Sequence, residues 1–288
     1  MTTGTAAGLA VTTFGSAPDE HGGPALLAVH GITANGMSWG AVAAHLPDRR
    51  ILAPDLRGRG RSNRLPAPYG LRRHAADLAQ LLDDDGGGSR VVLGHSMGAF
   101  VTVMLAASRP DLVERLVLVD GGFPLAVPPG GIDIARALGP AAERLSMEFA
   151  DEDAYLAYWR AHPAFARDWS PAVEDYVRYD LDGVAPHRHP SAVAAAMLED
   201  GAEQFGPEWY VAALRGLRMP VTVLRAPRGL TDAEPIYEPG MLEGYRALVP
   251  QLEVIEVADV NHYTILFADR GASAVADAVR QPAAKEPS

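Results

Sequence analysis

The stretch VVLGHSMGAF, residues 91–100, joins an apolar run to a serine held between two glycines. The run before the first glycine is typical of a buried strand, and the apolar residues from Met97 onward recur at helical spacing. Residues 94–98, GHSMG, therefore fit G-x-S-x-G in the strand–turn–helix context that this motif requires. Glycine stands on both sides because larger side chains would collide in so tight a turn. We predict that Ser96 is a nucleophile exposed at the edge of a sheet.

The sequence around this stretch alternates between strand and helix patterns. Short apolar runs predict strands at 9–15, 25–31, 50–58, 90–96 and 115–122. Apolar residues at helical spacing predict helices at 37–46, 71–86 and 97–108. Strand and helix in succession, with the later strands apolar on both faces, indicate an α/β fold with a parallel sheet covered by helices.

The middle of the chain departs from this alternation. Residues 123–217 form acidic, aromatic-rich helical segments, after which strand patterns return at 220–226 and 252–260 and a helix closes the pattern at 271–281. We therefore expect one core made of residues 1–122 and 218–280, interrupted by a helical cap at 123–217. The remaining residues, 281–288, are expected to form a disordered tail. A cap of this kind covers the carboxyl edge of the sheet, where open parallel sheets bind their ligands.

Composition limits the classes of partner. The chain has 288 residues with 36 acidic and 25 basic side chains, a net charge of −11. This charge repels nucleic acid and anionic membranes, so we expect neither as a partner. There is no cysteine, which excludes disulfides and thiolate metal sites. With no export signal and no long apolar run at its start, we expect a soluble, cytoplasmic monomer or homodimer that acts on a small molecule.

A nucleophilic serine needs a base and a site for negative charge. His262 follows the last predicted strand, in the chain order serine, acid, histidine, and is the candidate base. The backbone amides of Ile32 and Met97 are the candidate oxyanion hole, because one follows an early strand and the other begins the helix after Ser96. We assign His30 a structural role, in which its ring bonds backbone and holds its loop.

The other histidines are given no catalytic role. His95 is expected to lie inside the turn and to point away from it. His187 and His189 are spaced as metal ligands often are, but no carboxylates at ligand spacing accompany them, and we expect a solvated loop there.

These motifs resemble those of the α/β-hydrolase fold superfamily, in particular its capped, cofactor-free serine hydrolases. HGIT at 30–33, DLRGRGRS at 55–62, GHSMG at 94–98, LVLVD at 116–120 and NHYT at 261–264 occur in the order and spacing of that family. The resemblance implies a mostly parallel eight-stranded sheet, with Ser96 as nucleophile, His262 as base and the Ile32 and Met97 amides as oxyanion hole. It also implies that Asp55 and Arg57 tie backbone together and that no metal or cofactor is used.

The acid is the point where this sequence departs from most relatives. Most relatives carry the acid as an aspartate in the loop after the seventh strand of the family, which corresponds to the strand predicted here at 220–226. In this sequence Gly229 occupies that place, and the nearest acids, Asp232 and Glu234, come later. Asp120, at the end of the sixth strand, is the candidate that we prefer, because neighbouring strands lie about 4.8 Å apart and its carboxylate could reach His262. Asp232 remains the alternative acid.

A serine at the nucleophile position implies acyl transfer, whereas family members that attack alkyl carbons use an aspartate. We predict hydrolysis of a carboxylic ester or lactone through an acyl-enzyme. The cap aromatics suggest an apolar substrate, aromatic or polyketide-like, and the candidate binding residues are Tyr155, Trp159, Met197 and Trp209. Three alternatives share these motifs: a C–C bond hydrolase, a thioesterase or a lyase. A non-catalytic ligand receptor is the remaining class.

Overall fold

The computed structural model describes residues 1–15, 24–127 and 131–281. At its centre is an eight-stranded sheet in the order β1-β2-β4-β3-β5-β6-β9-β10. Neighbouring strands from β4 to β10 are parallel, whereas β1 pairs with β2 and β2 with β4 in antiparallel fashion. The strands are β1 Thr2–Ala6, β2 Leu9–Phe14, β3 Leu26–Val29, β4 Ile51–Pro54, β5 Arg90–His95, β6 Val113–Val119, β9 Val221–Arg225 and β10 Leu252–Glu256. The predicted α/β class with a mostly parallel sheet is confirmed.

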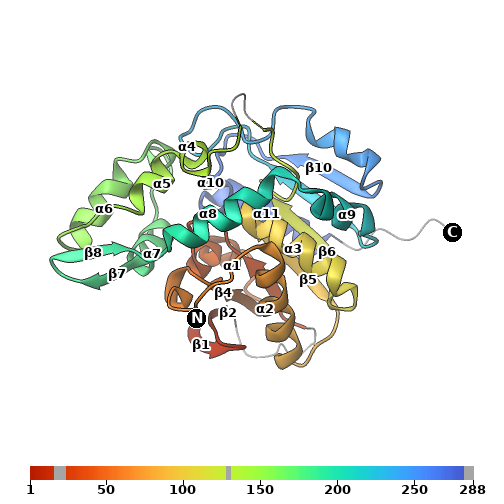
Figure 1. Ribbon diagram of the computed structural model, residues 1–288, viewed down its shortest axis with the longest axis horizontal. Coiled ribbons are helices and arrows are strands. Elements are labelled where there is room, and N and C mark those ends of the chain that lie inside the picture. Colours follow the sequence, from red (N-terminus) through yellow and green to blue (C-terminus); the bar gives the residue numbers. More distant parts are fainter. Residues whose placement is uncertain (16–23, 128–130, 282–288) are drawn as a thin grey trace.

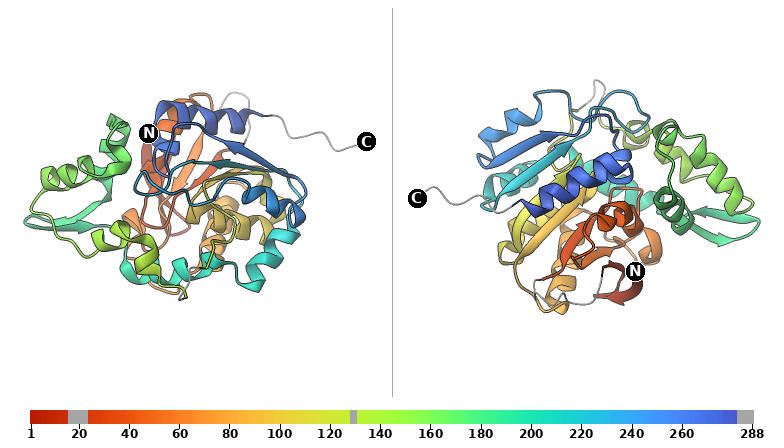
Figure 2. Two further views of the ribbon diagram at one scale, coloured as in Figure 1. Left: turned by 90° about the horizontal axis from the view of Figure 1, so that it is seen from above. Right: turned by 180° about the vertical axis from the view of Figure 1, so that it is seen from behind.

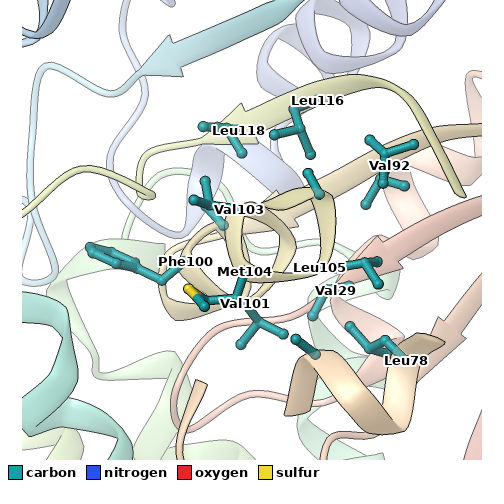
Figure 3. Close-up of a cluster of buried hydrophobic side chains, with 14 of the residues drawn as sticks. Val29, Leu78, Val92, Phe100, Val101, Val103, Met104, Leu105, Leu116 and Leu118 are labelled. Carbon is teal, nitrogen blue, oxygen red and sulfur yellow. The ribbon is translucent and has the colours of Figure 1, made fainter. Parts of the chain in front are cut away.

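Helices cover both faces of this sheet (Figure 1). One face packs against α2 (Leu71–Asp84), α3 (Met97–Ser108) and α9 (Glu208–Gly216), and the other against α1 (Gly40–Ala44), α10 (Thr264–Phe267) and α11 (Asp269–Arg280). Alternate residues of each strand point to opposite faces. In β6, for example, Leu116 and Leu118 belong to the first core, whereas Val117 and Val119 belong to the second. Figure 3 shows the first core, in which the side chains of α3 lie between the central strands and Leu78 of α2.

Strand β1 was not predicted, because its side chains do not alternate in hydrophobicity. It is largely exposed and pairs with β2 through a two-residue turn. The turn residues Ala7 and Gly8 both have positive φ angles, 51° and 78°. This backbone matches the twist of a two-residue hairpin.

The chain leaves the sheet after β6 and returns at β9. The intervening segments are α4 Ile134–Leu138, α5 Pro140–Arg144, α6 Glu152–Arg160, α7 Pro171–Asp180, β7 Leu181–Val184, β8 His187–Pro190, α8 Ala194–Ala202 and α9. The part from α6 to β8 projects to one side of the molecule in every view (Figure 2). Helix α9 falls within the predicted insert but packs on α3, where the ring of Tyr210 lies 5.2 Å from that of Phe100. Short 3-10 helices connect the elements at η1 Gly36–Trp39, η2 Gly60–Ser62, η3 Pro110–Leu112, η4 Pro163–Phe165, η5 Glu203–Phe205 and η6 Leu242–Ala247.

The segment that carries His187 and His189 is strand β8 of a hairpin with β7, not the expected loop. His187 is exposed and lies 3.0 Å from the carboxylate of Glu148. Over the described ranges, no cluster of histidine and acidic side chains has a metal-binding arrangement. Apart from Gln281, the predicted tail lies outside the described residues. None of the helices described is both long enough and apolar enough to cross a membrane.

Candidate active site

Ser96 lies in the turn between β5 and α3, here called the Ser96 turn (residues 94–98). Its φ of 53° and ψ of −124° put a non-glycine residue in a sparsely populated backbone region. The flanking glycines permit this turn. A Cβ atom on Gly94 would lie 2.5 Å from the carbonyl oxygen of Gly98, and one on Gly98 would lie 2.2 Å from that of Val29. The turn can therefore form only where both positions lack side chains, and it leaves Ser96 partly exposed.

A third glycine, which was not singled out from the sequence, supports the turn from the next strand. Gly121 follows β6, and a Cβ atom there would lie 2.3 Å from the carbonyl oxygen of Ser96 and 2.7 Å from its Cα. The backbone just after β6 is thus in direct contact with the backbone of Ser96, just after β5. The only signal in the sequence is a glycine pair after a predicted strand.

His262 and Asp120 meet at the carboxyl edge of the sheet. Nδ1 of His262 donates to Oδ2 of Asp120 at 2.7 Å, and both side chains are nearly fully buried. The amide of Ala226 donates to the other carboxylate oxygen at 3.1 Å. Because the carboxylate holds Nδ1–H, the lone pair of Nε2 remains for another partner. Ser96, Asp120 and His262 line one cavity.

Asp232, the alternative acid, does not contact His262. Its Oδ1 accepts hydrogen bonds from Nε of Arg228 at 2.6 Å and from the side-chain amide of Asn261 at 2.9 Å. Although partial burial opposes it, the Asn261 hydrogen bond and the Arg228 guanidinium lower the pKa of Asp232. This carboxylate thus holds the side chain of Asn261, the residue before His262, and forms no hydrogen bond with the ring of His262.

Of the two predicted amide donors, Met97 directly follows Ser96, and Ile32 lies in a loop that reaches the Ser96 hydroxyl. Ile32 lines the cavity, and a Cβ atom on the preceding Gly31 would lie 3.6 Å from Oγ of Ser96. Met97 begins α3, whose N-terminal amides carry partial positive charge. Within the described ranges, neither amide has a hydrogen-bond acceptor.

His30 holds backbone, as its predicted structural role requires. Nδ1 donates to the carbonyl of Gly31 at 2.8 Å, and Nε2 accepts from the amide of Leu56 at 2.9 Å. Burial lowers the pKa of His30 to about 3, so the ring is neutral at ordinary pH. Asp55 likewise accepts from the amides of Gly36 and Arg61, each at 2.7 Å.

The structure corrects the expectation for His95. Its side chain lines the cavity, and Nε2 donates to the backbone carbonyl of His262 at 2.8 Å. The two imidazole rings lie 4.6 Å apart between centroids. Burial, followed by the proximity of His262, lowers the pKa of His95 well below its usual value. Its position next to Ser96 is the only signal that the sequence carries.

The cavity has a volume of about 140 Å³ and mostly apolar walls. Besides Asp120, the lining residues that come from the chain between β6 and β9 are Gly121, Leu125, Ala137, Leu138, Ala141 and Gln204. The loop after β9 adds Leu230, Ile236 and Tyr237. No arginine or lysine is among the described lining residues. The site therefore offers little to pair with a charged substrate group.

None of the four predicted substrate-binding residues lines this cavity. Tyr155 and Trp159 are buried inside the cap, where the Tyr155 hydroxyl joins a hydrogen-bonded cluster. Met197 is buried in the first core, and the ring of Trp209 lies 4.3 Å under the guanidinium of Arg72. The prediction is thus not supported, because these helix-spaced side chains pack the cap and its contact with the core.

Comparison with known proteins places these features in a family. A family model described as alpha/beta hydrolase fold matches residues 24–269. The lipase LipV of Mycobacterium tuberculosis is 50% identical over 99 residues, which cover 34% of this chain and 38% of the lipase. The 2-(acetamidomethylene)succinate hydrolase of Mesorhizobium japonicum is 28% identical over 246 residues, which cover 85% of this chain and 84% of that enzyme.

Solved structures give the same result. A crystal structure of E-2-(acetamidomethylene)succinate hydrolase superimposes with a TM-score of 0.77 at 26% identity, over 94% of this chain and 93% of the other. The thioesterase domain from the curacin biosynthetic pathway, at 21% identity and a TM-score of 0.71, shares the fold over 97% of this chain and 98% of that domain. The chain spans little more than a third of the lipase, whereas it spans nearly all of the succinate-derivative hydrolase.

Proposed function

This chain belongs to the alpha/beta hydrolase fold family, and we propose that within this family it is a serine hydrolase that cleaves a carboxylic ester or lactone. The observation that carries the proposal is the 2.7 Å hydrogen bond between His262 and Asp120, in the cavity that Ser96 also lines. A serine, an imidazole and a carboxylate arranged around one cavity have the chemistry of a catalytic triad.

In this mechanism Oγ of Ser96 attacks the carbonyl carbon while Nε2 of His262 takes the hydroxyl proton. Asp120 stays ionised and stabilises the imidazolium. The Ile32 and Met97 amides hold the oxygen of the tetrahedral intermediate. Collapse of the intermediate expels the alkoxide, which receives the proton from His262, and leaves an acyl group on Ser96. Water, deprotonated by His262, then releases the acid.

The walls of the cavity favour an uncharged acyl group. Apolar side chains from the cap, including Leu138 and Ala141, line the cavity that Ser96 lines, and the polar lining side chains described are neutral or belong to the proposed triad. A substrate carboxylate in this cavity would lack a cationic partner, and burying an unpaired charge is costly. We therefore do not extend to this chain the succinate-derivative substrate that the relative's name gives.

The proposal is tested by labelling with a fluorophosphonate probe and by assaying a panel of uncharged esters, lactones and thioesters. We expect the wild type to be labelled and Ser96→Ala to be neither labelled nor active. Ser108→Ala is the matched control, because that serine ends the helix that follows Ser96, and among the described residues its hydroxyl bonds only the carbonyls of Met104 and Leu105 in that helix. Turnover by Ser96→Ala, or an unlabelled wild type, would contradict the proposal.

A further inference from the structure

Two buried arginines bind consecutive carbonyls of the loop that carries the Ile32 amide, here called the oxyanion loop (residues 31–34). Nε of Arg59 donates to the carbonyl of Ile32 at 2.9 Å, and Nη2 of Arg144 donates to the carbonyl of Thr33 at 3.1 Å. Arg59 comes from the core loop after β4, whereas Arg144 ends α5 in the cap. Both side chains are almost completely excluded from solvent.

Each guanidinium is paired with a buried carboxylate of the cap. Arg59 forms an ion pair with Asp200 of α8, and Arg144 pairs with Asp180, the last residue of α7, at 2.6 Å. Both aspartates have no exposed surface. Two separate helices of the cap therefore reach the oxyanion loop through one arginine each.

Further hydrogen bonds fix both carboxylates. Asp200 accepts from the amide of Gly70 at 2.6 Å and from Nε2 of His74 at 3.0 Å. Asp180 accepts from the hydroxyls of Ser191, at 2.7 Å, and of Tyr155. The carboxylates in turn orient the two guanidinium groups.

Buried ion pairs of this kind are seldom retained for stability alone, because well-packed apolar side chains often serve as well. What the pairs add is orientation. The carbonyl of Ile32 belongs to the peptide that follows its own amide, so holding two successive carbonyls restricts the backbone on one side of the Ile32 N–H. Nη2 of Arg59 also lies 3.8 Å from Sδ of Met97, the residue with the other candidate amide.

We propose that Arg59 and Arg144 are positioning residues of the oxyanion hole. Through their ion pairs with these arginines, Asp200 and Asp180 make the geometry of the hole depend on how the cap packs against the core. The proposal rests on the proposed function, because it takes the Ile32 amide as a donor to the reacting oxygen. It assigns the cap a role in stabilising the transition state in addition to lining the cavity.

The first test measures the loop itself and needs no turnover. In Arg59→Met/Asp200→Asn and in Arg144→Met/Asp180→Asn, each pair loses its charges together. The new amide oxygen can still accept from the amide of Gly70 in the first variant and from the hydroxyl of Ser191 in the second. Its NH2 group then faces Nε2 of His74 or the hydroxyl of Tyr155, each of which can accept a hydrogen bond. Arg90→Met/Asp85→Asn is the matched control, since this ion pair lies at the opposite edge of the sheet, where Arg90 begins β5. We expect amide hydrogen exchange in the peptide covering residues 31–37 to quicken at least about tenfold in the two test variants but not in the control.

The second test separates binding from catalysis. Because the oxyanion forms only after attack, a displaced donor lowers kcat and leaves KM nearly unchanged. With an uncharged p-nitrophenyl ester, we expect each test variant to lose about tenfold to a hundredfold in kcat, somewhat less than complete removal of a donor.

The outcomes distinguish this inference from the proposed function. Unchanged exchange in residues 31–37 of folded test variants would overturn the inference whether or not the enzyme cleaves esters. Faster exchange with kcat equal to that of the control would overturn it as well. An inactive wild type, by contrast, would count against the proposed function, while the exchange experiment would still decide whether the arginines hold the loop.

Discussion

Both the backbone and the carboxylate of Asp120 are constrained. Its φ of 45° is in the left-handed region, which costs free energy for a residue with a side chain. Both of its carboxylate oxygens are nevertheless engaged, one by His262 and one by the amide of Ala226. The strained backbone thus turns a buried carboxylate toward the imidazole and away from the strand that carries it.

We predict that Asp120→Asn lowers kcat/KM for an uncharged ester by about four orders of magnitude, because an amide neither stabilises the imidazolium nor selects its tautomer. Asp232→Asn should change it less than about threefold, since that side chain contacts Asn261 rather than the ring of His262. Steady-state kinetics of the two folded variants check this prediction. The opposite ranking would assign the acid to Asp232.

The single residues differ in how far the sequence could predict them. Ser96 lies in a local motif, and the glycines beside it follow from the geometry of one turn. The sequence favours Asp120 over Asp232 as the acid but keeps Asp232 as an alternative, because the choice depends on which carboxylate meets a ring 142 residues away from Asp120 along the chain. His95 was wrongly expected to point away, since its contact with the His262 carbonyl depends on the same long-range approach.

At the scale of elements, β6 and the Ser96 turn are in direct backbone contact. The tip of β6 approaches so closely that Gly121 has no room for a side chain next to Ser96. Such contact between adjacent strand ends brings a serine from one strand beside an aspartate from the next. The sequence predicts the two strands but not this contact, because their order in the sheet sets it.

We predict that Gly121→Ala destabilises the fold by about 1–3 kcal/mol, the usual cost of forcing extra volume into a packed site. It should also lower activity, because the added methyl group displaces the backbone of Ser96. Gly216→Ala is the control, since a Cβ atom at that helical position would contact nothing within 4 Å and alanine favours the helix. Urea denaturation and ester hydrolysis measure the two effects, and a Gly121→Ala enzyme as stable and active as the control would refute the argument.

The cap shows which properties of a group of helices the sequence predicts and which it does not. The sequence predicts its helices and its place between β6 and β9 from the change in pattern. Three of its aromatic side chains, Tyr155, Trp159 and Trp209, are predicted to bind the substrate. The structure instead uses them to pack the cap and its contact with the core, and small residues such as Ala137 and Ala141 are among those that line the cavity. Helical spacing identifies an apolar face but not what covers it.

For the molecule as a whole, the topology of the sheet assembles the site. Ser96, Asp120 and His262 follow β5, β6 and β10, and parallel strands deliver their carboxyl ends to one edge. The same edge places two buried histidines, His30 and His95, around the proposed catalytic group. Both are held neutral by burial, which lowers their pKa values, so the architecture of the site affects the stability of the entire fold.

This arrangement predicts a loss of stability in mild acid. In the unfolded chain both histidines take up protons near pH 6.5, whereas the folded chain resists protonation down to about pH 3 at His30 and well below 6.5 at His95. A lowered pKa in the folded state means that stability is complete above pH 6.5 and falls as the pH drops below it. From pH 7 to pH 5.5 the lowered pKa of His30 should cost about 1 kcal/mol, and the lowered pKa of His95 adds a loss of the same sign.

Urea denaturation at pH 7 and pH 5.5 measures this loss, and the interval lies above the range in which ordinary carboxyl groups titrate. We expect His95→Gln to reduce the difference in the free energy of unfolding between the two pH values, whatever its effect on stability at pH 7, because it removes one of the rings whose pKa burial lowers. An equal pH dependence in wild type and His95→Gln would mean that the folded protein takes up a proton at His95 as readily as the unfolded chain does. The structure argues against this, because Nε2 of His95 donates the one hydrogen bond of the ring and Nδ1 is buried without a partner among the described residues.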